Sequence, residues 1–422
     1  MPDGNPVQST LRRALFVAGL LLLAFLAGRL VVTAVTRAGE PSEGFVAYYT
    51  ASYLLMKGSP VEKLYDTNWV IPQVLRHTPG VREIYHANPP TTALLLVPLA
   101  GLDHHDARVA WIAFNLLLLP LILLLLIREG RLRGLDAIWG AILFVGFQPL
   151  RTGLAFGQVY ILMLLLLVVA WIGYRRDRPF LLGASLAALL LLKTAVVLLW
   201  PVLIVQRRWR ALGIAAGCTL AAVILTLPLI GVEAWRVYAG QLLLLGSRPE
   251  LAVTAYQSLP GLIWHLLSSD PVWNRHPLLD MPKAALALVI LSGAALIGWL
   301  LRHCSRAIGS DRAFAAGVLV SIILSPVSID YHYTLLLAPI LIMAASPPIR
   351  RSRTLSAAAL SGTLLIALPL GHTSPALASG LLALLSYPKL YGAMILLWVV
   401  ARAEPWNDST PFTAMESRPE HL

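Results

Sequence analysis

The stretch ALFVAGLLLLAFLAGRLVVTAV, residues 14–35, follows a pair of arginines, Arg12 and Arg13. As a helix it would extend about 33 Å at about 1.5 Å per residue, enough to cross about 30 Å of hydrocarbon. A cleaved signal peptide is the alternative, but the run is long and no small-residue cleavage site follows it. The stretch therefore predicts a retained membrane anchor.

Composition extends this prediction to the whole chain. Of 422 residues, 58% are hydrophobic and 13% are charged, with a mean hydropathy of +0.73. A soluble domain would be about a quarter charged and could not bury so much apolar surface. Further hydrophobic runs follow the first, so we expect an all-α, multi-pass membrane bundle of about 11–13 hydrophobic segments, forming a single domain over residues 1–402.

The net charge of +12 is carried largely by short basic clusters between the hydrophobic runs. A nucleic-acid surface would require one contiguous basic patch, so no nucleic-acid partner is expected. Short Arg-rich loops are instead typical of the cytoplasmic side of a membrane protein, which predicts a cytoplasmic N-terminus. The clusters are residues 128–133, 175–178, 207–210 and 350–353, with Arg302, Arg306 and Arg312 forming a fifth.

With the clusters inside, two polar segments, 38–88 and 232–282, lie outside. The first has four basic residues against five acidic, and the second three against four. Residues 180–206 run between two basic clusters, which favours a broken pair of short helices with Lys193 and Thr194 at the turn. The alternative, a full crossing by 89–102 and a single crossing by 180–206, would move six arginines outside. The polar residues 403–422 are expected to form a disordered cytoplasmic tail.

Candidate site residues gather on the predicted outer face. Lys193 interrupts a hydrophobic run, and an ionisable residue there indicates a functional site whose natural partner is an anion such as a lipid phosphate; a lysine snorkelling to the interface is the alternative. Asp330 and His332 combine a carboxylate with an imidazole, the pair used in acid–base catalysis, although a surface turn would also account for them. The remaining candidates are Glu43, Tyr48, Tyr49, Asp66, Arg151, Gln158, Gln257 and Ser258.

Other polar residues are given structural roles. The tyrosines also fit an interfacial aromatic belt, and Glu62 and Glu83 are expected to be solvated loop charges. The adjacent His104 and His105 would point apart at the start of a helix, so no metal site is predicted. Cys218 and Cys304 suggest neither a disulfide framework nor a zinc site. The chain carries no phosphate-binding loop of the Walker type.

Six stretches in order resemble the glycosyltransferases of family 87, membrane enzymes of the GT-C class that use polyprenyl-phosphate-mannose or related donors. They are FVAYYTASYLLMKG with LYD (64–66), NPPTTALLLVPLAGL, FGQVYILMLLLL, LLKTAVVLLWPVLIVQRRWRAL, YQSLPGL and LSPVSIDYHYTLLLAPIL. The resemblance implies a GT-C-type bundle with a long first extracytoplasmic loop. It also implies inverting sugar transfer from a lipid phosphate on the outer leaflet, with no cofactor or nucleotide.

The resemblance further implies roles for the candidates. Lys193, with Arg151 in support, would hold the leaving phosphate, and Gln158, Gln257 and Ser258 would position phosphate or sugar hydroxyls. His332 matches the second histidine of the family's S-P-x-S-W-x-H-H turn. Tyr331 replaces the first histidine of that turn, and Ile329 replaces the tryptophan. Many members have an aspartate base immediately before the phenylalanine of the first stretch. Here Gly44 holds that position, so Glu43 is the expected base, with Asp66 or Asp330 as alternatives.

The leading hypothesis is a glycosyltransferase of the bacterial plasma membrane. It would transfer a sugar, expected to be mannose, from a polyprenyl-phosphate donor to a glycolipid or polysaccharide acceptor of the cell envelope. A transporter or flippase of lipid-linked sugars is the alternative, as are an inactive relative and a structural partner in envelope assembly. An internal repeat with paired broken helices would favour transport, and the sequence contains no evident one.

Overall fold

The computed structural model describes residues 6–40, 42–246 and 249–404; part of the predicted tail, 405–422, lies outside the described residues. The described chain is helical, and its only β-pairing is an isolated bridge between Asp270 and Asn274. The α-helices are α1 (Pro6–Ala38), α2 (Phe45–Met56), α3 (Thr67–His77), α4 (His104–Glu129), α5 (Leu135–Gly146), α6 (Gln148–Ala155), α7 (Tyr160–Arg175), α8 (Pro179–Leu192), α9 (Leu199–Val205), α10 (Trp209–Ile230), α11 (Val232–Leu245), α12 (Leu259–Leu267), α13 (Pro282–Arg306), α14 (Asp311–Leu324), α15 (Leu337–Ala345), α16 (Pro347–Arg351), α17 (Arg353–Ala367) and α18 (Pro388–Arg402). Short 3₁₀ helices are η1 (Val61–Tyr65), η2 (Pro90–Leu94), η3 (Val97–Leu99), η4 (Pro249–Leu251), η5 (Asp330–Leu336), η6 (Pro375–Leu377) and η7 (Gly380–Ser386).

Within the described residues, four helices are long and apolar enough to cross a membrane alone: α1, α4, α10 and α13. The bent pair formed by η7 and α18 would make a fifth span, and seven further apolar segments are shorter. The expected hydrophobic segments are therefore present, but most are shorter than one bilayer crossing. Sequence hydropathy measures apolar length and does not show where a helix ends inside a run.

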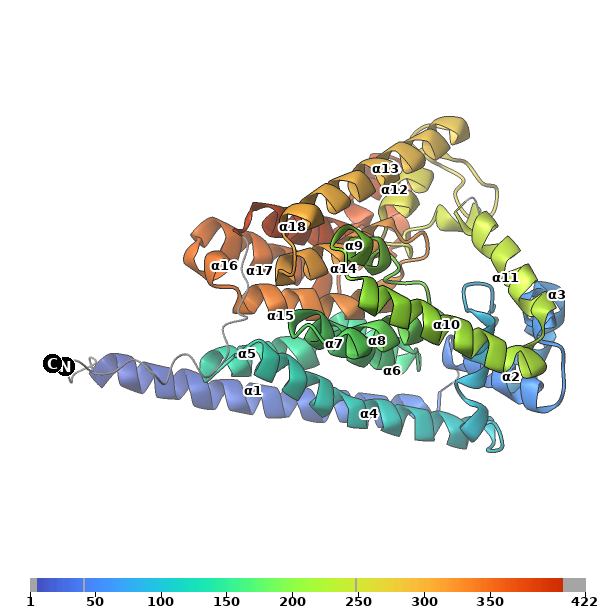
Figure 1. Ribbon diagram of the computed structural model, residues 1–422, viewed down its shortest axis with the longest axis horizontal. Helices are drawn as coiled ribbons and strands as arrows, with labels where there is room; N and C mark the ends of the chain where they lie inside the picture. The colour runs from blue at the N-terminus through green and yellow to red at the C-terminus, as the bar shows by residue number, and fades with distance from the viewer. Residues whose placement is uncertain (1–5, 41, 247–248, 405–422) are drawn as a thin grey trace.

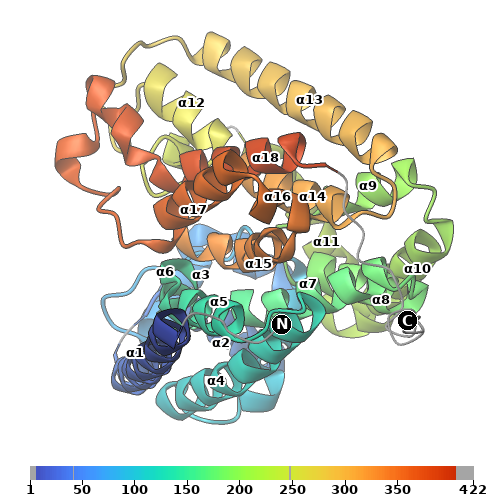
Figure 2. The ribbon, with the colours of Figure 1, turned by 90° about the vertical axis from the view of Figure 1, so that its left-hand side faces the viewer.

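The long helices lie at the rim of the bundle and the short ones fill its centre (Figure 2). Apolar side chains on the rim remain exposed: Leu21 on α1, Leu225 on α10 and Leu291 on α13 are 67%, 77% and 65% exposed. In contrast, α14 is buried from Asp311 to Ile323. Hydrocarbon tails would cover these exposed aliphatic side chains. Helices that face lipid must satisfy their own backbone hydrogen bonds across the bilayer, which agrees with the position of the full-length spans at the rim.

The basic clusters meet at one end of the bundle, where ion pairs join them. The carboxylate of Glu129, at the end of α4, lies 2.5 Å from Arg176 beyond α7. Arg350 of α16 pairs with Asp136 of α5 at 2.6 Å. We call this the basic end; it lies to the left in Figure 1.

Residues 180–206 form the predicted broken pair. Helix α8 ends at Leu192, and α9 begins at Leu199. The segment then returns to the basic end, because Arg208 donates to the Tyr174 carbonyl at 2.8 Å and approaches Asp177. Lys193 and Thr194 therefore occupy the far turn, as predicted.

The segment 38–88 is packed at the end opposite the basic clusters, to the right in Figure 1. Its helix α2 is buried along most of its length. The Ser52 hydroxyl donates to the Ala93 carbonyl at 2.7 Å and accepts from the Leu96 N–H at 3.1 Å. These bonds join α2 to residues 88–102, which we call the NPP segment. We call this end of the bundle the polar end.

Candidate active site

The site is built on two interlocked turns, residues 43–45 and 156–158. The Phe45 N–H donates to the Phe156 carbonyl at 2.9 Å, and the Trp111 indole N–H donates to the Gly157 carbonyl at 2.8 Å. Gly44 has φ of +83°, and a Cβ placed on it would lie 2.2 Å from Nε2 of Gln158. Backbone conformation and close approach therefore both favour glycine at position 44, where the resemblance expects an aspartate.

Gln158 and Tyr48 form one wall of the site. The Tyr48 hydroxyl donates to Oε1 of Gln158 at 2.7 Å, and both side chains are buried. Tyr160, at the start of α7, is fully buried, and its hydroxyl has no hydrogen-bond partner among the described residues. The tyrosine rings face Lys193, with Nζ 5.9 Å from the ring centre of Tyr48 and 5.4 Å from that of Tyr160.

Lys193 is positioned by the NPP segment. The Thr91 hydroxyl donates to the Leu191 carbonyl at 2.6 Å, and the Thr92 hydroxyl donates to the Leu192 carbonyl at 3.0 Å. These bonds satisfy carbonyls at the end of α8, where the helix can no longer do so. The chain continues in an extended conformation at Lys193, with φ of −164°. Its ammonium forms no hydrogen bond or ion pair with a described residue; the faces of Tyr48 and Tyr160 and the nearby Glu83 carboxylate stabilise it.

His332, in η5, contacts the same Tyr160 ring that Lys193 faces. Its Nδ1 accepts from the Ile329 N–H at 3.2 Å. The ring packs between Tyr160 and Tyr331, with ring centres 4.4 Å and 5.0 Å away. Because Nδ1 is an acceptor, a neutral His332 carries its proton on Nε2 and can donate it to a ligand.

Glu83 lies at the first of the two interlocked turns, where the sequence did not place it. It was expected to be a solvated charge, but its Oε2 accepts from the Gly44 N–H at 2.8 Å and its Oε1 from the Ile84 N–H at 3.0 Å. Burial raises the pKa of the Glu83 carboxyl above its ordinary value; the two N–H groups and the nearby Lys193 ammonium oppose this. One signal was available in the sequence: Glu83 lies a few residues before the NPP segment that positions Lys193.

The other carboxylates of the first polar segment lie in different surroundings. Glu43 belongs to the same turn as Gly44 but is exposed. Asp66 is the exposed N-cap of α3, where it accepts from the Asn68 N–H at 3.0 Å. The Tyr49 hydroxyl donates to the Leu102 carbonyl, and its ring contacts His77 and His104 instead of Lys193. The structure thus gives Asp66 and Tyr49 structural contacts, and leaves Glu43 at the edge of the site.

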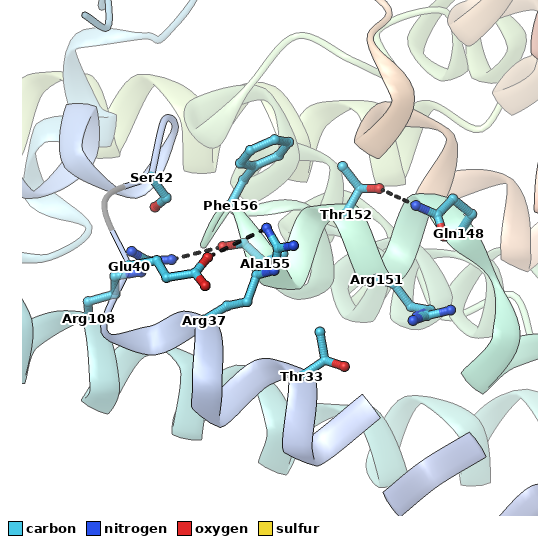
Figure 3. A pocket seen from close by; sticks show the side chains of 10 residues that line it. All are labelled: Thr33, Arg37, Glu40, Ser42, Arg108, Gln148, Arg151, Thr152, Ala155 and Phe156. Carbon is cyan, nitrogen blue, oxygen red and sulfur yellow. Dashed lines mark hydrogen bonds and ion pairs between the residues drawn. The ribbon is translucent and has the colours of Figure 1, made fainter. Parts of the chain in front are cut away.

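Arg151 was expected to support Lys193 in binding the leaving phosphate, but it lines a cavity apart from the site described above. That cavity lies between α1, α4 and α6, and Arg37 and Arg108 also line it (Figure 3). Lys193 is not part of its lining.

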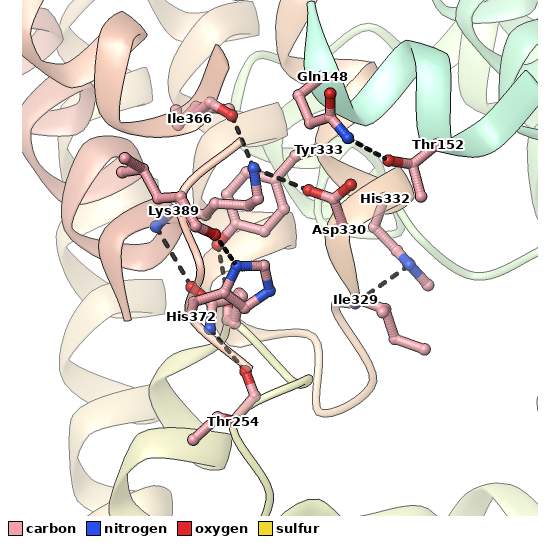
Figure 4. A network of polar contacts seen from close by, with 12 residues as sticks. Gln148, Thr152, Thr254, Ile329, Asp330, His332, Tyr333, Ile366, His372 and Lys389 are labelled. Carbon is pink, nitrogen blue, oxygen red and sulfur yellow. Dashed lines mark hydrogen bonds and ion pairs between the residues drawn. The ribbon is translucent and has the colours of Figure 1, made fainter. Parts of the chain in front are cut away.

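Asp330 forms a buried ion pair with Lys389 of α18. Its Oδ1 lies 2.7 Å from Nζ of Lys389, which also donates to the Ile366 carbonyl at 2.7 Å (Figure 4). The lysine is 1% exposed and the aspartate side chain 13%. The ion pair with Lys389 occupies this carboxylate, so the structure argues against Asp330 as the base.

Gln257 and Ser258 serve the backbone. The Gln257 amide donates to the Thr254 and Ser386 carbonyls at 2.7 and 2.6 Å, and its oxygen accepts from the Lys389 N–H. Ser258 is the N-cap of α12, accepting from the Gly261 N–H at 3.1 Å. Both residues are fully buried. The Gln257 bonds join the second polar segment to η7 and α18, and the Ser258 bond caps α12; neither supports the expected contact with substrate.

One group of possible metal ligands occurs at the start of α4. Ligand atoms of Asp103, His105 and Asp106 lie within 4.8 Å of one another, and all three residues are exposed. Asp103 is the N-cap, accepting from the Asp106 N–H at 3.0 Å. Its pKa is lowered by that bond. These contacts belong to a helix start and carry no assignment of a metal.

The apolar helices and the clustered polar side chains at one end define a multi-pass membrane protein with a buried polar site. The sequence model of glycosyltransferase family 87 matches residues 85–326, more than half of the chain. The chain therefore belongs to glycosyltransferase family 87 and is a membrane glycosyltransferase.

The chain is also similar to a polyprenol-phosphate-mannose-dependent alpha-(1-2)-phosphatidylinositol mannoside mannosyltransferase of Mycobacterium tuberculosis. The two are 28% identical over 313 residues, which covers 69% of this chain and 70% of the relative.

Proposed function

We propose that this protein transfers mannose from polyprenol-phosphate-mannose to a glycolipid acceptor at the outer face of the bacterial plasma membrane. The observation that carries the proposal is the Lys193 ammonium, which has no ion-pair partner among the described residues and faces the Tyr160 ring that His332 also contacts. Such a cation, withdrawn between aromatic rings, suits the phosphate of a lipid-linked donor. Family membership and the donor in the relative's name support the same class of substrate.

The leaving phosphate is assigned to Lys193, His332 and Tyr160. As the bond between the anomeric carbon and the phosphate oxygen breaks, the electron pair stays with the phosphate, so its negative charge grows. The Lys193 ammonium, the Nε2–H of His332 and the Tyr160 hydroxyl are the donors available to stabilise that charge. Arg151 is left out of this set because it lines another cavity.

The acceptor hydroxyl is assigned to a carboxylate at the two interlocked turns, and we favour Glu83, which accepts from the Gly44 N–H. It removes the hydroxyl proton while the oxygen attacks the anomeric carbon from the face opposite the phosphate, which inverts the configuration. A general base works best with a pKa near the working pH, and burial moves the pKa of Glu83 in that direction. Glu43, the base expected from the sequence, is exposed in the same turn and is the second candidate.

The outer-face orientation rests on charge. The basic clusters lie at one end and the site at the other. The positive-inside rule assigns the basic end to the cytoplasm, which assigns Lys193 and Glu83 to the outside.

The test is a transfer assay in proteoliposomes with polyprenol-phosphate-mannose and a mannolipid acceptor. Glu83→Gln should lower the rate about 10²–10⁴-fold, as expected for loss of a general base. Lys193→Gln should lower it about 10²-fold or more. Glu62→Gln, in the same polar segment, is the matched control and should retain full activity.

Three outcomes would contradict the proposal at different levels. If the wild type transfers no sugar from any lipid-linked donor, the function is wrong, and movement of the intact donor across the bilayer would identify a transporter. If Glu43→Gln abolishes transfer and Glu83→Gln does not, the base is Glu43. If a membrane-impermeant probe labels a cysteine introduced at Glu43 only from the cytoplasmic side, the orientation is wrong.

A further inference from the structure

A cationic cavity of about 260 Å³ lies beside the candidate site and has no part in the chemistry assigned above (Figure 3). It is enclosed by α1, α4 and α6. Its lining includes three arginines, Arg37, Arg108 and Arg151, and one acidic residue, Glu40. The excess of positive charge indicates an anionic ligand.

Arg108 is the buried member of this group. It is 1% exposed, and its Nη2 donates to the Ala155 carbonyl at 3.0 Å. Its Nε and Nη1 have no hydrogen-bond partner among the described residues, nor does the Ser42 hydroxyl in the same lining. Burying a guanidinium without satisfying its donors is costly, whereas a phosphate would satisfy several donors at once.

The other two arginines carry charge that the fold neutralises only slightly. Arg151 is half-buried, and its guanidinium forms no hydrogen bond or ion pair with a described residue. Arg37 approaches Glu40 at 3.6 Å, but both side chains are more than half exposed, so the pair contributes little. Arg29 lies two turns before Arg37, on the same side of α1 as Thr33, which also lines the cavity.

The cavity shares a wall with the candidate site. Ser42 and Phe156 line the cavity, and two residues further along the chain from each, Gly44 and Gln158 line the site. Two residues of chain extend at most about 7 Å, so the two sites lie within the reach of one sugar headgroup. On its other side the cavity borders α1, whose exposed apolar side chains face the lipid.

From these observations we propose that the Arg37–Arg108–Arg151 cavity binds the phosphodiester headgroup of a phospholipid-anchored acceptor. Its acyl chains would lie along α1, and its glycan would extend past Gly44 toward Glu83. The inference rests on the proposed function. The donor phosphate is a different group, because it must leave from the anomeric carbon beside Lys193, which does not line this cavity.

The first test measures lipid binding without catalysis. Purified protein in nanodiscs would be titrated with phosphatidylinositol, with diacylglycerol of the same chain length, and with polyprenyl phosphate, and bound lipid counted by native mass spectrometry. We expect wild type to bind phosphatidylinositol over diacylglycerol, and Arg151→Gln to weaken that binding at least tenfold. Polyprenyl phosphate binding should be unchanged in Arg151→Gln and reduced in Lys193→Gln.

The second test separates the two substrates kinetically. Arg37→Gln and Arg151→Gln should raise KM for a phospholipid-anchored mannoside at least tenfold, with KM for polyprenol-phosphate-mannose unchanged. With a free mannoside as acceptor, the variants and wild type should have equal rates. Arg151→Lys should recover part of the loss, and Arg133→Gln, an exposed arginine at the basic end, should match wild type.

Two results would overturn the inference: unchanged phosphatidylinositol binding in Arg151→Gln, or an equal loss of polyprenyl phosphate binding, which would make the cavity the donor site. Arg108→Gln is read only through these binding ratios, because a variant of a buried arginine can also fold poorly. If no acceptor supports transfer, the proposed function fails, while the binding experiment still tests the cavity.

Discussion

Gly44→Ala tests whether the interlocked turns require a glycine. Two separable costs arise. The φ of +83° strains any residue with a Cβ, at about 1–2 kcal/mol. The new Cβ would also lie 2.2 Å from Nε2 of Gln158 and 3.0 Å from the Phe156 carbonyl oxygen. Overpacking of this kind costs about 1–3 kcal/mol. We therefore expect a loss of about 2–5 kcal/mol in the free energy of unfolding.

The chain supplies a control that isolates the second cost. Gly58 has φ of +73°, but a Cβ added there would meet nothing within 4 Å, so Gly58→Ala carries the backbone strain without the clash. Unfolding of both variants in the same detergent should differ by about 1–3 kcal/mol. Equal destabilisation would refute the argument from close approach.

A double variant sharpens the test. The Gln158 contact involves the end of a flexible side chain, whereas the Phe156 contact is with backbone. Gln158→Ala should therefore recover part of the Gly44→Ala loss and not all of it. Additive losses would show that the two positions do not compete for space. Transfer activity should stay low in Gly44→Ala, in Gln158→Ala and in the double variant, because displacing or removing the Gln158 side chain releases Tyr48.

Three further predictions concern neighbouring groups. Burial raises the pKa of Glu83, so kcat/KM should fall as pH decreases through a midpoint above the usual glutamate value of about 4.3. Glu83→Gln should remove this loss of activity at low pH. If the loss persists in the variant, it belongs to another group. Lys389→Met should lower the free energy of unfolding by about 3–5 kcal/mol, because it leaves Asp330 buried and unpaired. Thermal unfolding should show that the double variant Lys389→Met with Asp330→Leu recovers much of this loss. No recovery would argue against a stabilising ion pair. Ser258→Ala should lower the free energy of unfolding by about 1 kcal/mol, because it removes the N-cap of α12, and it should leave KM unchanged. A raised KM would instead support the contact with substrate expected from the sequence.

Charge distribution predicted the course of the chain more reliably than hydropathy did. Arginines flank residues 180–206 on both sides, so an even number of crossings was required, and the break at Lys193 followed. Hydropathy alone could not show that most of the segments are short, because an apolar side chain suits the bundle centre and the lipid equally well. Among the described residues, the position of the four full-length spans at the rim is a property of packing.

The site was predictable only where one residue has a single plausible environment. Lys193 in a hydrophobic run has few alternatives to a functional position, and the structure does bring it together with Tyr48, Gln158 and His332. Asp330 and Glu83 were both carboxylates near a polar segment, and their environments depend on distant partners. Lys389 lies 59 positions after Asp330, and Gly44 lies 39 positions before Glu83. Such pairs cannot be inferred from local spacing.

Gly44 and Glu83 are best understood together. An aspartate at position 44 would project its carboxylate from the turn, but its Cβ would meet Gln158. With glycine there, the turn can pack against Gln158, and its N–H is directed to Glu83 at 2.8 Å. A carboxylate is thus present at the same turn, brought from the other end of the polar segment. On this argument Gly44→Asp with Glu83→Gln should not restore transfer, and restoration in that double variant would show that the turn tolerates a side chain.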